Sequence, residues 1–361
     1  MDYLSKIAQD LGMPRSSVYR AIKHMKPMSA ETRKRVIEYI KANYPEKLTQ
    51  LNSFSENRGG KHIAVIMPYK PEYFWKEASD GMEAARESFG DECPAELKFI
   101  FYAGTISENE LISILDSIEV STADALCVVP VDTERVAEKI NDISRRIPVA
   151  IFNEVCRGAV AFLNVVSNGY AEGRAVGKMV TEQCPAGSHI IRISTDDYTS
   201  DVFNDRMRGF GDAVRENYFI DEVSLDCSEN YYYHTILPSL MARKVNEKIN
   251  RIESAGGSVS ATYVTNGALL PLFIALRKLD RQDISVFGHE INESALEFYK
   301  NGMRGGYVKQ DIYMQGYSVI NGLIRKLFYD KDVYPEIYNT AFDSDSYSES
   351  GHERNEQNGS V

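Results

Sequence analysis

From residue 61 onwards, short apolar runs alternate with longer helical patterns. The runs fall at residues 62–67, 98–102, 125–129, 149–152, 190–193, 261–264 and 284–287, and most are rich in residues that favour strands. Runs that are apolar along their whole length are typical of strands buried on both faces, and helices between them imply parallel pairing. The sequence therefore predicts an α/β body built on parallel sheets. Two such lobes facing each other would form a cleft beyond the carboxyl ends of the strands.

The first 45 residues have a purely helical pattern. Apolar positions in residues 4–11 share one helical face, and Gly12 ends that run. Pro14 opens a second helix, where a missing backbone N–H is tolerated, and Ser29 is the expected N-cap of a third helix. Three short helices in this order indicate a helix-turn-helix DNA-binding domain. The outer face of the second helix carries cations and hydroxyls suited to base edges and phosphates, namely Arg15, Ser16, Tyr19, Arg20 and Lys23.

The charge distribution follows the same division. Residues 1–61 hold twelve Lys or Arg and six Asp or Glu, a net charge of +6, while the whole chain carries −11, so the remaining residues carry −17. Positive charge binds DNA phosphates, which the acidic body would repel, so we expect DNA contact only in the first part. The alternative is that these cations form only a solvated helical face.

Several motifs, in the order in which they occur, resemble the LacI/GalR family of bacterial transcription regulators. The motifs are Ser17-Val18-Tyr19-Arg20, Ser29-Ala30-Glu31-Thr32-Arg33, and the segments 205–210, 265–267, 283–290 and 310–317. The resemblance implies a helix-turn-helix domain over 1–45 and a two-lobed domain, like that of periplasmic binding proteins, over 61–340. It also implies a homodimeric repressor that binds two operator half-sites and is controlled by a carbohydrate-like effector. Ser29 joins the candidate DNA contacts on this basis.

Two polar segments flank the body. Residues 46–60 are expected to be a linker, and the resemblance implies a hinge helix there that inserts Leu51, or Leu48, into the minor groove. A plain linker is the alternative. Residues 341–361 are acidic and rich in Ser, Asn and Gly, so we expect a disordered tail.

Candidate ligand contacts come from an aromatic cluster and from the strand ends. Tyr73, Phe74 and Trp75 follow the first strand, and flat rings stack on the apolar faces of sugars, although they could instead close the core. Tyr231 could form the opposite wall of the site or belong to a solvent-facing loop. By resemblance, the polar contacts are Asn153, Asn204 or Arg206, Asn266, Glu290 and Gln310. Arg206 could instead cap a helix or pair with a carboxylate, and Glu290 could be an ordinary surface residue.

Other functional classes lack their sequence signatures. The chain shows no phosphate-binding glycine loop, nucleophile elbow or metal-ligand spacing, so we expect no catalysis, no cofactor and no metal. No apolar run approaches the roughly 20 residues that span a bilayer, and no signal peptide is visible, which predicts a soluble cytoplasmic protein without membrane partners. The five scattered cysteines suggest no disulfides. A sugar-acting enzyme and a ligand-binding interaction protein without DNA function remain the alternatives.

Overall fold

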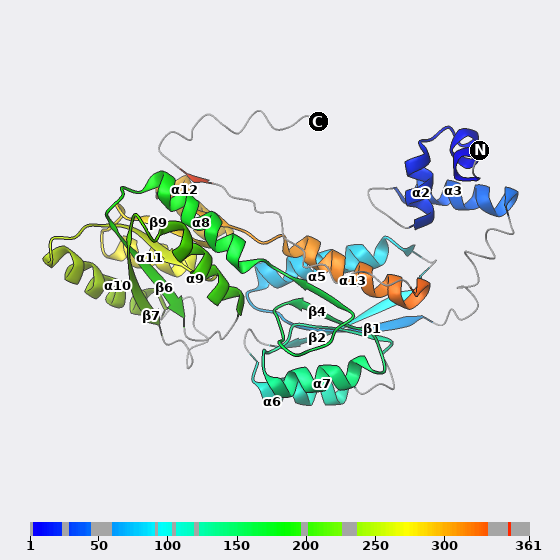
Figure 1. Ribbon diagram of the computed structural model, residues 1–361, viewed down its shortest axis with the longest axis horizontal. Coiled ribbons are helices and arrows are strands. Elements are labelled where there is room, and N and C mark those ends of the chain that lie inside the picture. The colour runs from blue at the N-terminus through cyan, green and yellow to red at the C-terminus, as the bar shows by residue number, and fades with distance from the viewer. Residues whose placement is uncertain are drawn as a thin grey trace.

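The structure is a computed structural model that describes residues 3–23, 29–44, 60–90, 93–102, 106–118, 123–195, 201–225, 237–330 and 346–347. Figure 1 shows a small group of helices at the N-terminus and two α/β lobes that follow it in sequence. We call these parts the head (residues 3–44), lobe 1 (residues 60–166 and 312–330) and lobe 2 (residues 169–308 and 346–347). Within the described segments, no helix is both long and apolar enough to cross a membrane.

The head is built from α1 (Tyr3–Asp10), α2 (Arg15–Lys23) and α3 (Ala30–Asn43). Its core is a single cluster of small and β-branched side chains that all three helices contribute, namely Ile7, Ala8, Val18, Ala21, Val36 and Ile40. Gly12 adopts a left-handed φ of 62° in the turn between α1 and α2, which glycine alone accepts without cost. The Ser29 side chain accepts from the Thr32 N–H at 3.1 Å, so the predicted N-cap is confirmed.

Lobe 1 is a parallel sheet with helices on both faces. Its elements are β1 (Lys61–Pro68), α5 (Glu72–Glu87), β2 (Ala95–Tyr102), α6 (Glu108–Ser117), β3 (Ala125–Val128), α7 (Glu134–Ser144), β4 (Val149–Asn153), β5 (Leu163–Val166) and α13 (Ile312–Tyr329). The sheet order is β2-β1-β3-β4-β5. Alternate residues of the strands pack against α5 and α13 on one face and against α6 and α7 on the other. Burial on both faces explains why β1, β3 and β4 are continuous apolar runs.

Lobe 2 repeats this architecture. Its elements are α8 (Gly169–Gln183), β6 (His189–Thr195), α9 (Asp201–Val214), β7 (Phe219–Leu225), α10 (Leu237–Ser254), β8 (Val259–Val264), α11 (Leu269–Lys278), β9 (Ser285–His289), α12 (Glu293–Lys300), β10 (Gly305–Val308) and β11 (Ser346–Tyr347). The sheet order is β11-β10-β9-β8-β6-β7. Helices α8 and α9 cover one face, and α10, α11 and α12 cover the other. All seven predicted strands are present, so the expectation of two lobes with parallel sheets is confirmed.

The chain passes between the lobes more than once. It leaves lobe 1 after β5, returns from β10 to α13, and reaches lobe 2 again at β11. In β11, Ser346 and Tyr347 pair antiparallel with Gly306 and Gly305, which corrects the prediction of disorder at these two positions: edge strand β10 offers backbone groups that a short strand can satisfy. The rest of the predicted tail lies outside the described residues, as do most of the predicted linker and its candidate Leu51.

Helices α8 and α9 approach each other unusually closely. A Cβ at Gly173 would lie 2.0 Å from the Arg206 carbonyl oxygen, and a Cβ at Gly209 would lie 2.1 Å from the Tyr170 carbonyl oxygen. Only glycine permits such backbone contact. The consequence for function is that the Arg206 side chain on α9 lies beside the neighbouring turn of α8.

Candidate functional site

Three predicted polar residues lie where strands of the two sheets end. Asn153 is the last residue of β4, while Glu290 and Gln310 come directly or shortly after β9 and β10. All three are buried, so Glu290 is not a surface carboxylate. Asn153 and Glu290 have left-handed φ angles of 66° and 54°. Residues other than glycine rarely adopt this backbone conformation, and such strain tends to persist at functional sites.

Arg206 is the centre of a buried charged group. Its Nε donates to Glu172 Oε2 at 2.7 Å, and its Nη1 donates to the Thr265 carbonyl oxygen at 3.1 Å. Its Nη2 lies 3.6 Å from Glu290 Oε1. The side chains of Arg206 and Glu172 are 1% and 0% exposed, so this ion pair is sheltered from water. The possibility that Arg206 pairs with a carboxylate is therefore confirmed, and it has two such partners.

A cluster of amides adjoins the charged group. Asn153 Nδ2 donates to Gln310 Oε1 at 3.3 Å and to Gln315 Oε1 at 3.5 Å, and Gln315 Nε2 donates to Gln310 Oε1 at 3.1 Å. The backbone N–H of Gln310 donates to Glu290 Oε1 at 3.4 Å. Gln310 therefore joins the strand end of lobe 1 to the charged group of lobe 2.

Several buried polar atoms of this region have no hydrogen-bond partner among the described residues. They are Glu172 Oε1, Arg206 Nη2, Glu290 Oε2 and His289 Nδ1. Buried polar groups are normally hydrogen-bonded, because an unsatisfied group costs about 1–3 kcal/mol. Donor and acceptor atoms side by side are what the hydroxyls of a small polar ligand would satisfy.

Burial also sets the protonation states. It raises the pKa of Glu290 to about 7, with the Arg206 charge opposing the rise and the Glu172 charge adding to it. Burial, together with the positive charge of Arg206, holds the pKa of His289 well below its ordinary value, so its ring is neutral. The His289 Nε2 lies 2.9 Å from the Tyr263 hydroxyl. The site thus offers one fixed cation, carboxylates and neutral hydrogen-bonding groups.

The aromatic cluster lies in the first turn of α5, not in a loop. The Tyr73 hydroxyl is 3.1 Å from the place that a Cβ on Gly267 would occupy, so Tyr73 of lobe 1 reaches lobe 2 beside Glu290. Phe74 and Trp75 are buried in the core of lobe 1, and Trp75 makes an edge contact with Phe152. This is the core packing that the sequence left open, and a direct ligand contact for the two rings stays a prediction.

The remaining predicted ligand contacts differ in placement. Asn266 is buried, and its Oδ1 accepts from the Ala268 N–H at 3.1 Å at the start of α11. Asn204 is exposed on α9, so of the two alternatives it is Arg206 that lies in the polar cluster. Tyr231 lies outside the described residues.

The predicted DNA contacts are only partly described. Arg15 and Ser16 are exposed at the start of α2, and Ser29 is exposed at the start of α3. Tyr19, Arg20 and Lys23 belong to α2, but their side chains lie outside the described part of the chain.

The sequence did not indicate Glu172 or Gln315 as site residues, and His289 stood out only as part of the 283–290 motif. Glu172 resembled an ordinary surface residue of an amphipathic helix. Its one signal was the spacing of Gly169, Gly173 and Gly177 on α8, which marks a face where another backbone comes close. Gln315 stood within a motif that was noticed only as a resemblance.

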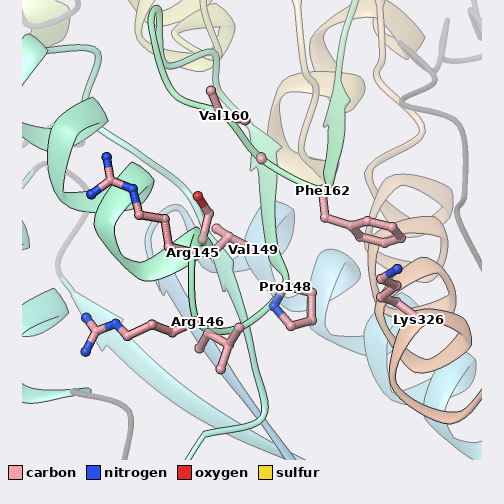
Figure 2. A pocket seen from close by; sticks show the side chains of 10 residues that line it. Arg145, Arg146, Pro148, Val149, Val160, Phe162 and Lys326 are labelled. Atoms are coloured by element: carbon pink, nitrogen blue, oxygen red, sulfur yellow. The ribbon is translucent and has the colours of Figure 1, made fainter. Parts of the chain in front are cut away.

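Figure 2 shows a different hollow, at the amino ends of β4 and β5. Pro148, Val160 and Phe162 line it, and the Lys326 ammonium lies over the Phe162 ring at 5.5 Å from its centroid. Because it lies at the opposite end of the lobe 1 strands from Asn153, it is separate from the polar cluster. The described residues contain no group of three or more His, Cys, Asp or Glu that could hold a metal ion.

Comparison with known proteins agrees with the two-lobed fold. A family model described as a periplasmic binding protein domain matches residues 63–328. No curated protein sequence matches the chain.

Similar solved structures share the two-lobed fold. A glucose-galactose binding protein, GanP, from Geobacillus stearothermophilus is 20% identical with a TM-score of 0.66, and the match covers 80% of this chain and 98% of that one. A candidate LacI transcriptional regulator from Bacteroides fragilis is 15% identical with a TM-score of 0.67, and the match covers 80% of this chain and 98% of that one. A carbohydrate transporter solute binding protein from Agrobacterium radiobacter, in complex with D-arabinose, is 14% identical with a TM-score of 0.67. The match covers 82% of this chain and 97% of that one.

Proposed function

The chain belongs to the family of periplasmic binding protein domains, and we propose that it is a transcription regulator: a small sugar or polyol binds between its lobes and controls the affinity of the head for operator DNA. The observation that carries the proposal is that one chain combines a basic three-helix head with a two-lobed body whose strand ends gather buried, unsatisfied polar groups.

The chemistry of the cluster supports a hydroxyl-rich ligand. Arg206 Nη2 is a donor, Glu290 Oε2 is an acceptor, and the amides of Asn153 and Gln310 can do both. Sugars and polyols present adjacent hydroxyls that donate and accept at fixed angles. Similar structures include a protein bound to D-arabinose and one bound to glycerol, which is consistent with this class of ligand.

The head supports DNA binding. Arg15 and Ser16 are exposed at the N-terminal end of α2, where a recognition helix contacts base edges and phosphates. The net charge of +6 over residues 1–61 contrasts with the acidic body. We further propose a cytoplasmic homodimer whose two heads bind half-sites about 34 Å apart, with the ligand acting through lobe closure and a coupling of about 1–3 kcal/mol.

The first test is selection of duplexes from a random pool by the full chain, followed by titration of the best duplex at several salt concentrations. We expect a two-fold symmetric site and an affinity that falls steeply with salt. The double variant Arg15→Ala and Arg20→Ala should lose DNA binding but melt like the wild type. Arg208→Ala, an exposed arginine of lobe 2, is the matched control and should bind normally.

The second test is calorimetry with a panel of monosaccharides and polyols, repeated in the presence of the selected duplex. Binding of one compound together with a changed DNA affinity supports the regulator. Sugar binding without any selected duplex would instead identify a sugar-binding protein without DNA function. Turnover of the sugar would identify an enzyme.

A further inference from the structure

We infer that Glu172 is a specificity-determining residue of the ligand site: by compensating the charge of Arg206, it makes the site accept neutral polyhydroxy ligands and reject anionic ones such as uronic acids and sugar phosphates. The inference rests on the proposed function, since it concerns the same site. It narrows the ligand class, and it assigns a role to a residue that does not stand out in the sequence.

The hydrogen bonds of Arg206 support this first. Arginine binds carboxylates and phosphates through two parallel N–H groups of its planar fork. Here Nε donates to Glu172 at 2.7 Å and Nη1 donates to the Thr265 carbonyl oxygen at 3.1 Å. Only Nη2 has no hydrogen-bond partner among the described residues, and it lies 3.6 Å from Glu290. Glu172 therefore blocks two-pronged binding of an anion through the Nε–Nη2 edge, and Nη2 is the nitrogen left to donate to a ligand.

The balance of charge supports it independently. The buried group contains one cation, Arg206, and two carboxyl groups, Glu172 and Glu290. It has no net positive charge in either protonation state of Glu290. An anionic ligand would add negative charge where the medium screens little. A neutral ligand needs only hydroxyls that accept from Arg206 Nη2 and donate to Glu290 Oε2.

Two other cations that follow strand ends, Lys309 and Arg157, have carboxylate partners. Lys309, beside Gln310, places its Nζ 2.8 and 3.0 Å from the two carboxylate oxygens of Glu77 on α5. Arg157, which follows β4, donates its Nε to Asp132 at 2.7 Å. Neither can lend its charge to a ligand without giving up an existing ion pair.

The backbone fixes Glu172 in place. Because α8 and α9 meet through Gly173 and Gly209, the Glu172 carboxylate has little room to swing away from Arg206. Its compensation of the charge is thus built into the fold and does not depend on a ligand. Replacing the carboxylate with an amide of the same size removes the negative charge and leaves the packing.

The test is calorimetry of the full chain at about pH 7.5 and low salt with matched pairs of ligands. Galactose is compared with galacturonate, glucose with glucuronate, and glucose with glucose 6-phosphate. The proteins are the wild type, Glu172→Gln, and Glu182→Gln as a control, since Glu182 is an exposed residue of α8. Because each ratio of affinities is measured within one folded protein, a small loss of stability does not affect it.

We expect the wild type and Glu182→Gln to bind the neutral member of at least one pair about 100-fold more tightly than its acid, and Glu172→Gln to reduce this ratio at least tenfold. The affinity that Glu172→Gln gains for the acid should fall as salt is added.

Equal or tighter binding of an acid by the wild type would overturn the inference and leave ligand binding in place, and this holds even if Glu172→Gln fails to fold. An unchanged ratio in a folded Glu172→Gln would overturn it as well. If none of the compounds binds any of the proteins, the proposed sugar-binding function itself fails, and this inference with it.

Discussion

The two lobes share one architecture but contribute different chemistry to the site. Both are parallel sheets covered by helices on two faces. Lobe 1 supplies neutral groups, the Asn153 and Gln315 amides and the Tyr73 hydroxyl, whereas lobe 2 supplies the buried charges of Glu172, Arg206 and Glu290. A repeated fold therefore does not imply a repeated function. In our proposal, lobe 2 determines which ligand charge is accepted, and lobe 1 completes the hydrogen bonds.

If lobe 2 carries the charges of the site, removal of its buried cation should have the largest effect on stability. Arg206→Met should lower the free energy of unfolding by about 3–5 kcal/mol, because Glu172 and Glu290 would remain buried without their counter-charge. Urea denaturation measures this loss. Arg208→Met, two residues along the same helix, removes an exposed arginine that pairs with Asp205 and lies over the Tyr170 ring, and it should cost less than about 1 kcal/mol. Equal losses would mean that the buried charges of lobe 2 carry no special weight.

The next test uses pH. The pKa of Glu290 is about 7 in the folded protein and 4.5 ordinarily, so the folded state holds its proton more tightly. Its contribution to stability is complete below the ordinary pKa and is lost as pH rises through about 7. Glu290→Gln should therefore gain stability relative to the wild type, by roughly 3 kcal/mol, between about pH 4 and pH 8.

Denaturation of both proteins at several pH values gives this difference directly, because titrating groups that do not interact with Glu290 cancel. Asn153→Asp, which places a carboxylate among the neutral groups of lobe 1, can be measured in the same way for comparison. A constant difference between Glu290→Gln and the wild type would contradict the assigned environment of Glu290.

The junction between the lobes can be tested with a double-mutant cycle. Gly267→Ala places a methyl group 3.1 Å from the Tyr73 hydroxyl oxygen, which is closer than ordinary van der Waals contact. The substitution should therefore destabilise the protein by about 1–3 kcal/mol. Tyr73→Phe removes that hydroxyl and should recover most of the loss in the double variant. Thermal unfolding of the four proteins measures the coupling. Strictly additive effects would mean that Tyr73 does not press on lobe 2.

The smallest expected effect concerns the backbone of lobe 1 at Asn153. Because Asn153 has a φ of 66°, Asn153→Gly and Asn153→Ala both remove the amide, but only the alanine is strained. We expect the glycine variant to be more stable than the alanine variant by about 1 kcal/mol, as measured by urea denaturation. The reverse order would show that the left-handed backbone conformation of residue 153 does not limit the stability of the alanine variant.

The sequence predicted the strands that are long apolar runs and missed those that are charged, rich in glycine or very short. β3 and residues 149–152 of β4 are apolar throughout because helices cover both faces of these strands. β7, by contrast, is an edge strand that carries Asp221 and Glu222, so its composition resembles that of a loop. β10 contains two glycines, and β5 is only four residues long. Such strands form because neighbouring strands offer them backbone partners, which a local pattern does not reveal.

The site was predictable where its residues end strands. Asn153, Glu290 and Gln310 follow apolar runs or stand in motifs, and the structure brings them together. Glu172 could not be found in this way, since it lies in a helix and owes its role to contact with another helix. Trp75 is conspicuous in the sequence, and its ring packs against Phe152 in the core, which was the alternative to a ligand contact.

Gln310 lies on a segment that connects the lobes, and it is bonded to both of them. Its N–H donates to Glu290, while its side chain accepts from Asn153 and Gln315. Rotation of one lobe against the other must stretch one of these bonds. The connection is therefore not a free hinge but a joint with a preferred angle and a measurable stiffness. Any molecule that competes for the Gln310 amide would change both the preferred angle between the lobes and the stiffness of the joint.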